Sequence, residues 1–376
     1  MTLDHSEDGL LNNELALKRL SLYCFKNYEE LNLEFNSSII CILGDNGLGK
    51  TNILDAIYYL AFCKSYFNSI DSQNIKNGFE QGSISGEFLR LDQPENIHCA
   101  IRKAQKKIFK RNHKEYDRLS AHIGLLPAVI ITPYDIELIL DGSEVRRKFI
   151  DSTISQYAHP YLDHLVQYNQ ALLQRNNLLK QWGKNGGYNA EMIEPWNMRL
   201  VFHGEAIHEE RKKFIEEFSP IFNDVYKAIS GGKEEVTLLF DNDLDNQRFE
   251  DLLLRNIDRD RILERTNNGP HKDDLDFIMN GFPLKKFASQ GQQKSFLISL
   301  KLAQYLILRQ HNETTPILLL DDLYDKVDES RVSNLLNWLI QHHPGQIFIT
   351  DTHPHRIPEI LTKLKSAFQV ISVDQA

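Results

Sequence analysis

The sequence predicts an α/β fold, in which a mixed sheet with flanking helices is interrupted by an inserted helical lobe. Two short, continuous apolar runs, Ile39–Leu43 and residues 316–320, have the composition of buried parallel strands. Between these runs, apolar residues recur three and four positions apart in 161–173 and 214–225, which indicates long amphipathic helices. No heptad array continues far enough to predict a long coiled coil.

The first apolar run leads directly into a phosphate-binding loop. Residues 44–51 read Gly-Asp-Asn-Gly-Leu-Gly-Lys-Thr, the complete G-x-x-x-x-G-K-[ST] pattern, and helical periodicity begins near Lys50. Glycines let backbone amides turn towards the phosphates, and the helix N-terminus adds partial positive charge. We expect Lys50 to reach the β- and γ-phosphates and the Thr51 hydroxyl to ligate Mg²⁺. A glycine-rich turn without a ligand is the alternative, and the flanking strand and helix argue against it. The expected nucleotide-binding residues are Gly44, Asp45, Asn46, Gly47, Leu48, Gly49, Lys50, Thr51 and Asn52.

The second apolar run ends in two carboxylates, the Walker B pattern. We expect Asp321 to hold Mg²⁺, directly or through water, and Asp322 to orient or activate the attacking water. Most of the chain separates Lys50 from Asp321, which is too far for a small nucleotide kinase or GTPase core. The intervening segment must therefore be inserted between two halves of one sheet.

A third motif precedes the Walker B strand. Residues 287–294, Phe-Ala-Ser-Gln-Gly-Gln-Gln-Lys, lead into a helix and resemble the signature motif of ABC-type ATPases. In those proteins the serine hydroxyl, the glycine amide and the helix dipole meet the γ-phosphate held by the opposite subunit. The resemblance assigns Ser289, Gly291 and Gln292 to the catalytic site. The alternative is a plain capping box formed by Ser289 and Gln292, but the order of the motifs along the chain favours the signature.

Two further positions follow the Walker B strand. Asp328 occupies the place of the D-loop aspartate in ABC-type proteins. His353 ends another apolar strand, as the switch histidine does, and an ordinary surface histidine is the open alternative. We expect both residues to act in catalysis.

These motifs together resemble the RecF family of bacterial recombination mediators, which is related to the SMC-like ABC ATPases. The resemblance covers residues 15–370. It is carried by residues 17–20 with Asn27 and Tyr28, 44–52, 55–60, 141–143 with Arg146 and Arg147, 174–176, Gly-Pro-His-Lys-Asp-Asp-Leu at 269–275, Ser-Gln-Gly-Gln-Gln and Leu-Leu-Asp-Asp.

The resemblance implies an ATPase head and a helical lobe without a coiled-coil arm. We therefore expect an N-terminal extension (1–14), a first part of the ATPase lobe (15–133), a helical lobe (134–268) and a second part of the ATPase lobe (269–376). The resemblance also implies ATP and Mg²⁺ as cofactors, slow and DNA-stimulated hydrolysis, ATP-dependent homodimerisation, and binding of single- and double-stranded DNA at gaps or junctions. RecR, RecO and, indirectly, RecA are the implied partners, in recombinational repair, replication and the SOS response.

The chain departs from the family pattern in one consistent way. Lys26, Lys272 and Lys294 stand where we expect family arginines, and Asn68 stands near the place of another. Lysine keeps the charge but loses bidentate recognition of phosphate or carboxylate. Any nucleotide contact from these positions is therefore expected to be looser.

A local excess of positive charge marks the candidate DNA-binding segment. Residues 102–114 contain seven lysines and arginines and no carboxylate, in a chain of net charge −9. We expect a hairpin whose cations pair with DNA phosphates without sequence preference, although a solvated tip is the alternative. Arg146, Arg147 and Lys148 are a weaker candidate, since they could instead pair with carboxylates of the head. The expected DNA contacts are Arg102, Lys103, Lys106, Lys107, Lys110 and Arg111.

Other features favour a cytoplasmic protein. The four cysteines, Cys24, Cys41, Cys63 and Cys99, are widely spaced and read as reduced thiols. The acidic, polar N-terminus excludes a secretory signal, and no apolar run approaches the roughly 20 residues that cross a bilayer. Two other classes are considered: a transporter-type ABC subunit, opposed by the long insertion and the divergent signature, and an SMC-like exonuclease ATPase, opposed by the lack of heptads and of a nuclease metal cluster.

Overall fold

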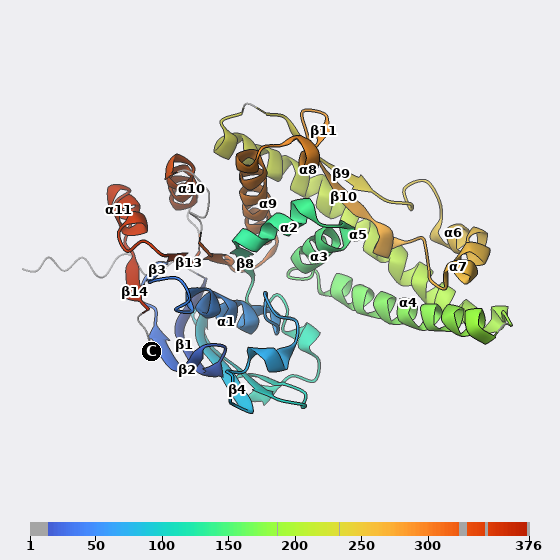
Figure 1. The fold of residues 1–376 in the computed structure, drawn as a ribbon, viewed down its shortest axis with the longest axis horizontal. Coiled ribbons are helices and arrows are strands. Elements are labelled where there is room, and N and C mark those ends of the chain that lie inside the picture. The colour runs from blue at the N-terminus through green and yellow to red at the C-terminus, as the bar shows by residue number, and fades with distance from the viewer. Residues whose placement is uncertain (1–13, 186, 233, 323–328, 343–344, 374–376) are drawn as a thin grey trace, which may run out of the picture. The chain divides into compact units, whose positions relative to one another are not determined.

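The computed structural model describes residues 14–185, 187–232, 234–322, 329–342 and 345–373. They belong to two compact units, one built from Met1–Asp135 and Lys294–Ala376 and the other from Ile136–Gln293. The predicted α/β head with an inserted helical lobe is confirmed, and the part of the chain that the structure describes forms no long coiled coil (Figure 1).

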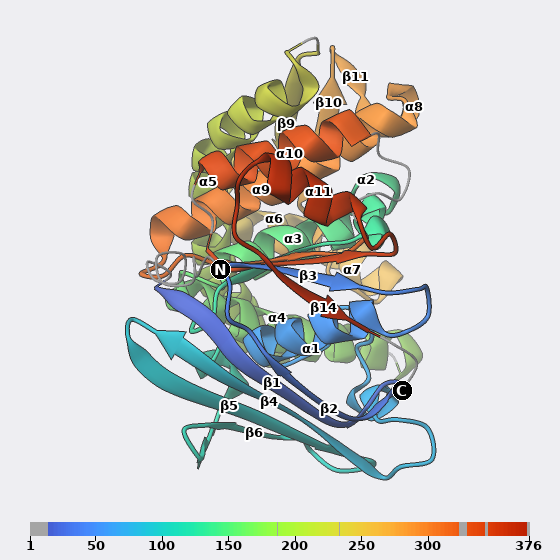
Figure 2. The ribbon, with the colours of Figure 1, turned by 90° about the vertical axis from the view of Figure 1, so that its left-hand side faces the viewer.

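One sheet of the first unit is antiparallel throughout. Its order is β2-β1-β4-β5-β6-β7, and its long strands run side by side in Figure 2. The strands are β1 (Leu15–Phe25), β2 (Tyr28–Glu34), β4 (Gln81–Arg90), β5 (Gln93–Arg102), β6 (Ile108–Arg111) and β7 (Lys114–Glu115). Alternating buried and exposed positions along β4 and β5 show that one face of this sheet covers the core.

The other sheet of the first unit is parallel, in the order β14-β3-β13-β12-β8. Its strands are β3 (Ile39–Leu43), β8 (Ala128–Ile131), β12 (Ile317–Leu320), β13 (Ile347–Asp351) and β14 (Gln369–Ser372). Every residue of β3, β8, β12 and β13 is buried, which accounts for the continuous apolar runs in the sequence. The carboxyl ends of all five strands lie along one edge, and the motifs of the predicted site follow them.

Helix α1 (Lys50–Phe62) lies between the two sheets of the first unit (Figure 2). Almost all its residues are buried, and they share one core cluster with residues of both sheets. A helix that is apolar all round is expected where both sides are covered. The other helical elements of this unit are α10 (Glu329–Gln341), α11 (Arg356–Lys363), and the short turns η1 (Asp71–Asn74), η2 (Leu119–Ala121) and η3 (Pro133–Ile136).

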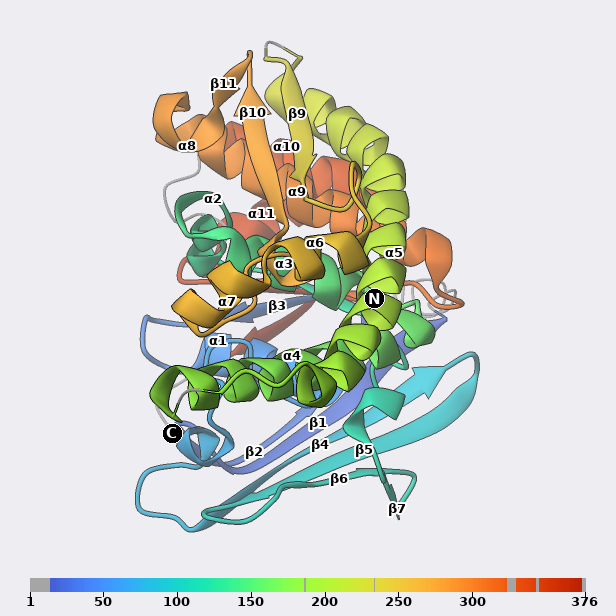
Figure 3. The ribbon, with the colours of Figure 1, turned by 90° about the vertical axis from the view of Figure 1, so that its right-hand side faces the viewer.

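The second unit is built on a pair of long helices, α4 and α5, which lie side by side in Figure 3. The buried residues of α5 include Phe214, Phe218 and Phe222, which are spaced as the sequence predicts. None of the described helices in either unit has the length and apolar character needed to cross a bilayer. The helical elements of this unit are α2 (Glu137–Leu140), α3 (Ser143–Ile154), α4 (His159–Asn185), α5 (Ala190–Ser230), α6 (Phe249–Arg255), α7 (Ile257–Leu263), η4 (Pro270–Lys272) and α8 (Leu284–Phe287). Helix α9 (Gln290–His311) begins in this unit and belongs to the first unit from Lys294 onward.

A small antiparallel sheet extends the second unit beyond the expected boundary at residue 268. Strand β9 (Val236–Asp241) pairs with β10 (Asp274–Met279), and β10 pairs with β11 (Phe282–Pro283). Because the partner of β10 lies in the helical segment, the residues after 268 stay with that segment as far as Gln293. The sequence of β10 alone does not reveal which strand it pairs with.

Candidate functional site

The loop between β3 and α1 has the backbone of a phosphate cradle. Gly44, Gly47 and Gly49 have φ angles of 156°, 83° and 98°, which residues with side chains rarely adopt. A Cβ at Gly49 would also lie 2.3 Å from the side-chain nitrogen of Asn27, and one at Gly44 would lie 2.5 Å from the carbonyl oxygen of Val373. The loop therefore depends on glycine, and it ends at a helix N-terminus, where the dipole favours an anion.

Lys50 begins α1 and turns back into this loop. Its Nζ donates hydrogen bonds to the carbonyl oxygens of Gly44, at 2.7 Å, and Asp45, at 2.8 Å. The residue is only 8% exposed. Burial lowers the pKa of the ammonium group, and the carboxylates of Asp322 and Asp321 oppose that shift. An ammonium held by two neutral carbonyls can exchange them for phosphate oxygens, with which its hydrogen bonds are stronger.

Thr51 and Asp321 are in direct contact, although the whole helical insertion lies between them in the sequence. Thr51 Oγ1 donates to the two carboxylate oxygens of Asp321 at 2.9 and 3.0 Å, and Thr350 Oγ1 donates to the same carboxylate at 2.8 Å. Burial raises the pKa of Asp321, whereas the hydrogen bonds from Thr350 and Thr51 lower it. A hydroxyl beside a buried carboxylate offers the hard oxygen ligands that Mg²⁺ prefers, so this pair fits the predicted metal role.

Asp322 has different surroundings from Asp321. Its φ is 42°, in the left-handed region, and its backbone amide donates to Thr350 Oγ1 at 2.9 Å. A non-glycine residue held in this region costs about 1–3 kcal/mol, and such strain concentrates at functional sites. The two carboxylates therefore differ in backbone geometry and in burial, and their separate roles in metal binding and in water positioning stay predictions.

The turn between β1 and β2 holds the phosphate loop from one side. Asn27 Nδ2 and Tyr28 OH donate to the Leu48 carbonyl oxygen at 3.0 and 3.2 Å, and Asn52 Nδ2 donates to Asn27 Oδ1 at 2.7 Å. Burial raises the pKa of Tyr28 to about 12, so its hydroxyl stays a donor at neutral pH. Sequence analysis placed Asn27 and Tyr28 only in the family resemblance. Their loop contact depends on a hairpin that residue spacing alone does not position.

The chain after β13 also turns at this edge of the sheet. Buried Asp351 accepts hydrogen bonds from Arg356 Nη2 at 2.5 Å, from Arg356 Nε at 3.1 Å and from the backbone amide of His353 at 3.1 Å. The His353 side chain is exposed, and its switch role stays a prediction. The D-loop prediction for Asp328 falls outside the described residues.

Two of the positions where we expected arginine, Lys26 and Asn68, make different contacts within the first unit. Lys26 Nζ pairs with buried Asp55 at 2.5 Å, and the same carboxylate accepts from Ser65 Oγ at 2.6 Å and from the Tyr66 amide at 2.7 Å. Lys26 therefore serves an internal ion pair. Asn68 makes a local turn, in which its side-chain oxygen accepts from a backbone amide two residues later at 3.1 Å.

Ser289 and Gln292 form a reciprocal capping box at the start of α9. The Ser289 amide donates to Gln292 Oε1 at 2.8 Å, and the Gln292 amide donates to Ser289 Oγ at 3.3 Å. Capping does not exclude the signature role, because Ser289 is exposed and its hydroxyl still has a proton to donate. The catalytic roles of Ser289, Gly291 and Gln292 stay predictions.

The basic segment forms the expected hairpin, but two of its cations are held internally. Lys107 Nζ donates to the carbonyl oxygen of Cys63, the C-cap residue of α1, at 2.5 Å and pairs with Asp71 at 3.0 Å. Arg111 makes a two-pronged ion pair with buried Glu95, one bond of which is 2.8 Å long. These two side chains hold the hairpin in place, so their charges are already matched by carboxylates of the same unit.

The other four predicted DNA contacts of the hairpin are more available to a ligand. Lys103 pairs with Glu80 at 2.9 Å on the surface, where such a pair contributes little. Arg102, Lys106 and Lys110 form no ion pair with a carboxylate of the described residues, and Arg102 and Lys106 are exposed. The DNA contacts predicted at this hairpin are therefore best carried by Arg102, Lys106 and Lys110.

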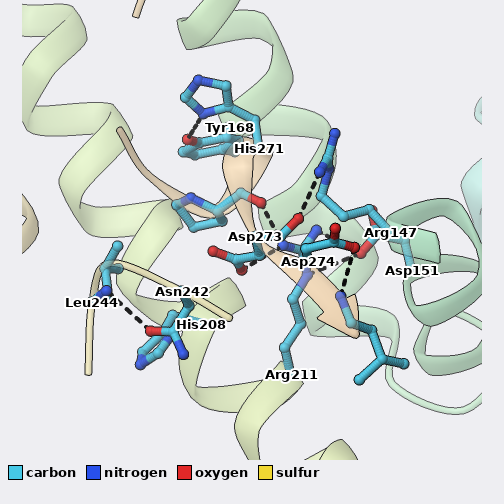
Figure 4. Close-up of polar contacts among 12 residues, drawn as sticks. Arg147, Asp151, Tyr168, His208, Arg211, Asn242, Leu244, His271, Asp273 and Asp274 are labelled. Atoms are coloured by element: carbon cyan, nitrogen blue, oxygen red, sulfur yellow. Dashed lines mark hydrogen bonds and ion pairs between the residues drawn. The ribbon is translucent and has the colours of Figure 1, made fainter. Parts of the chain in front are cut away.

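Residues 269–275 lie in the second unit and contact a buried arginine, Arg211 (Figure 4). Arg211 Nη1 donates to the Pro270 carbonyl oxygen at 2.6 Å and to Asp273 Oδ2 at 2.8 Å, and its Nη2 donates to Asp151 Oδ1 at 2.8 Å. Burial raises the pKa of Asp273 to about 6, although Arg211 acts to lower it. The Gly-Pro-His-Lys-Asp-Asp segment thus organises the interior of the helical unit.

The neighbouring basic residues of α3 differ in their hydrogen-bond and ion-pair partners. Arg146 makes two hydrogen bonds to the Asp274 carboxylate, at 2.7 and 2.8 Å, so its charge is matched inside the unit. Lys148 pairs with Glu144 at 2.7 Å on the surface. Arg147 donates to a backbone oxygen, that of Asp273, at 2.6 Å, and forms no ion pair with a carboxylate of the described residues. The alternative of carboxylate pairing therefore holds for Arg146 and Lys148.

A phosphate loop whose threonine meets the acidic end of another parallel strand is the arrangement of P-loop ATPases, and the helical insertion narrows this class to heads of the ABC type. Residues 16–375 match the domain described as the RecF/RecN/SMC N terminal domain. Within this class, the chain belongs to the RecF family.

Relatives over nearly the full length support this placement. The chain is 46% identical over 359 residues to the DNA replication and repair protein RecF of Flavobacterium johnsoniae, which covers 96% of this chain and 100% of that protein. It is 44% identical over 361 residues to RecF of Parabacteroides distasonis, covering 96% and 98%.

Solved structures agree with the sequence relatives. The recombination mediator protein RecF-ATPrS of the RecFOR pathway matches with a TM-score of 0.83 and 28% identity, covering 94% of this chain and 95% of that chain. An Smc head domain from Pyrococcus furiosus matches with a TM-score of 0.58 and 18% identity, covering 96% and 94%, which shows a shared fold alone.

Proposed function

We propose that this chain is an ATP-dependent DNA-binding protein of DNA replication and repair, which acts on single- and double-stranded DNA at gaps or junctions. In this role it dimerises on ATP and helps RecR and RecO to load RecA in recombinational repair and the SOS response. Slow, DNA-stimulated hydrolysis resets the dimer. Full-length relatives described as DNA replication and repair protein RecF support this assignment.

The contact between Thr51 and Asp321 is the observation that carries the ATPase part of the proposal. It joins the phosphate loop to the Walker B strand at 2.9 Å across 270 positions of sequence. A glycine-rich turn without a ligand needs no buried carboxylate beside its threonine. The solved structure of the recombination mediator protein RecF with ATP, which matches with a TM-score of 0.84, supports ATP as the nucleotide.

The residues of the loop divide the work of binding and hydrolysis. The backbone amides of residues 44–49 and the Lys50 ammonium bind the phosphates, and Asn27 keeps the loop in shape through Leu48. Thr51 and Asp321 are the residues that would hold Mg²⁺, which when bound supplies positive charge to the β- and γ-phosphate oxygens. Asp322 orients the attacking water.

A second copy of the chain completes the site. In an ABC-type dimer, Ser289 and Gly291 of one protomer meet the nucleotide held by its partner, with the helix dipole of α9 directed at the γ-phosphate. The exposed Ser289 hydroxyl agrees with such a contact. ATP then joins the two protomers, and hydrolysis separates them.

The state of the cysteines supports a cytoplasmic location. Cys24, Cys41, Cys63 and Cys99 are all free and buried. Burial raises the pKa values of Cys41, Cys63 and Cys99 to about 12, which keeps these thiols protonated and unreactive. A chain stabilised without disulfides suits a reducing compartment.

The proposal is tested by measuring DNA binding with ATP, with ADP and without nucleotide, while light scattering reports the oligomeric state. We expect ATP to increase both DNA affinity and dimer content, and Lys50→Ala to abolish the increase. DNA binding that is equal in all three nucleotide states would refute ATP control. Absence of ATP hydrolysis with and without DNA would refute the ATPase role.

A further inference from the structure

We propose that the second unit carries its own contact for the phosphate backbone of DNA, formed by Arg147, Arg265 and Lys272. We call these three residues the lobe cations. The inference rests on the proposed DNA binding, but it places a contact outside the basic hairpin of the first unit. It also gives a role to Lys272, which the internal ion pairs of residues 269–275 leave unused.

His271 brings two of the lobe cations to the same loop. Its Nε2 and the Thr266 carbonyl oxygen lie 3.1 Å apart, and its Nδ1 lies 2.7 Å from the Tyr168 hydroxyl. Burial lowers the pKa of His271 to about 4, so the ring is neutral, with Nε2 donating to Thr266 and Nδ1 accepting from Tyr168. Because Arg265 precedes Thr266 and Lys272 follows His271, this hydrogen bond holds the two cations close together.

Arg147 approaches the same loop from α3. Its Nη1 donates to the carbonyl oxygen of Asp273, the residue after Lys272, at 2.6 Å. Figure 4 shows the Arg147 side chain directed at the chain beside Asp273. The loop thus carries Arg265 and Lys272, and Arg147 is hydrogen-bonded to it from a distant part of the sequence.

The carboxylates around this loop are matched by other arginines. Three buried or largely buried side chains, those of Arg146, Arg175 and Arg211, form these pairs: Arg146 with Asp274 at 2.7 Å, Arg175 with Asp260 at 2.7 Å, and Arg211 with Asp151 and Asp273, both at 2.8 Å. Glu264 is the carboxylate next to Arg265 in the sequence, and its side chain lies against the backbone of α4 at Gly183. None of the described carboxylates forms an ion pair with a lobe cation.

The lobe cations therefore repel one another. Burial is the largest cause of the lowered pKa of Lys272, Arg265 and Arg147 lower it further, and Asp260 opposes the shift. Lys272 and Arg265 are exposed at the surface. A bound anion would relieve this repulsion.

The form of the site favours a polyanion over a small ligand. Lys272 is the exposed last residue of the short turn η4, where a backbone phosphate of DNA can approach without a deep pocket. Lysine binds phosphate as a point charge, and the contact needs no particular base. In a chain of net charge −9, a local cluster of this kind is where a nucleic-acid backbone is attracted.

The double variant Arg265→Gln/Lys272→Gln tests this site, and it leaves the Arg147–Asp273 hydrogen bond in place. DNA affinity is measured by fluorescence anisotropy of a labelled duplex with ATP, over a series of salt concentrations. Loss of two phosphate contacts should lower the slope of log K against log salt by about 1.8 and weaken binding about 60-fold near 0.1 M salt. Lys272→Arg should keep the wild-type slope.

The matched control is Lys213→Gln/Arg248→Gln, which removes two exposed cations of the same unit that pair with Glu210 and Glu250. The control should keep nearly the wild-type slope. If the salt slope falls equally in both double variants, the effect is due to net charge alone, and the proposed site is wrong.

Two further measurements show whether the lobe cations bind DNA phosphates or nucleotide phosphates. ATP affinity and ATP-driven dimerisation should be unchanged in Arg265→Gln/Lys272→Gln. If dimerisation is lost while the salt slope is kept, the lobe cations serve nucleotide phosphates and the DNA assignment is overturned. If the wild type binds DNA and the double variant binds with the same slope, this site alone is wrong. If the wild type binds no DNA in any nucleotide state, the proposed function fails as well.

Discussion

Replacing Arg211 by methionine removes the centre of the buried network in the helical unit. The guanidinium contacts Asp151, Asp273 and the Pro270 carbonyl oxygen, and it is only 2% exposed. Methionine fills much of the same volume but leaves Asp273 buried without its main cation. Breaking a buried ion pair on one side costs about 3–5 kcal/mol.

The loss should depend on pH in a direction set by Asp273. Its pKa in the folded protein is about 6, above the ordinary value of 3.8, so its contribution to stability is full below pH 4 and is lost as pH rises through 6. Arg211 lowers this pKa, so Arg211→Met should raise it further, and each unit adds about 1.4 kcal/mol of destabilisation at high pH. We therefore expect a larger stability difference between variant and wild type at pH 8 than at pH 5.

Thermal and urea unfolding at pH 5, 6.5 and 8 measure this effect. At pH 8 the transition of the helical unit should fall by about 10 °C, at roughly 2–4 °C for each kcal/mol. Arg211→Met/Asp273→Asn should recover part of the loss, because the unpaired charge is gone. Arg248→Gln, which breaks an exposed ion pair, should change the transition by less than about 0.5 kcal/mol. A loss that is absent, or that is equal at pH 5 and pH 8, would refute the role assigned to Asp273.

Three further predictions concern the ATPase and the hairpin. Lys50→Ala should abolish or strongly weaken ATP binding in calorimetry, whereas Asp322→Asn should bind ATP and turn over much more slowly; normal turnover would place water positioning elsewhere. Lys106→Gln/Lys110→Gln should lower the salt slope of duplex binding by about two units without changing ATP affinity, and an unchanged slope would mean that the hairpin faces solvent. Ser289→Arg should keep ATP affinity and block dimerisation, and mixing it with Lys50→Ala should restore some ATPase activity. Activity equal to the sum of the two mutants, with heterodimers shown to form, would exclude sites shared between protomers.

The parts of the site that follow from local sequence were predictable. The loop from Gly44 to Thr51 lies between a buried strand and a helix, as its pattern requires, because glycine conformation and hydrophobic periodicity are local properties. The capping box of Ser289 and Gln292, which the sequence analysis gave as the alternative to the signature, is also a local feature. Proximity of Thr51 and Asp321 was implied because their two motifs assign both residues to the same Mg²⁺ ion.

Pairings made through strand register were not predictable in this way. Seven cations without a carboxylate in residues 102–114 suggested a free basic surface, yet Glu95 on the neighbouring strand matches Arg111. Asp71, on a turn after α1, matches Lys107 in the same manner. The residues that contact the phosphate loop from the β1–β2 turn, Asn27 and Tyr28, also depend on how one sheet sits beside the other within the first unit.

The order of the parallel sheet, β14-β3-β13-β12-β8, has a consequence for how the protein is made. β3 pairs with β13 and β14, and β8 pairs with β12, so neither early strand has a neighbour until the end of synthesis. While the ribosome completes the chain, the antiparallel sheet and the helical unit can already fold. The apolar strands β3 and β8 still lack their neighbouring strands, so their backbone hydrogen-bonding groups are unpaired. Such unpaired edges expose a nascent chain to aggregation, and pairings this distant form slowly. A chain that stops before Ile347 carries an intact phosphate loop on a strand with nothing beside it.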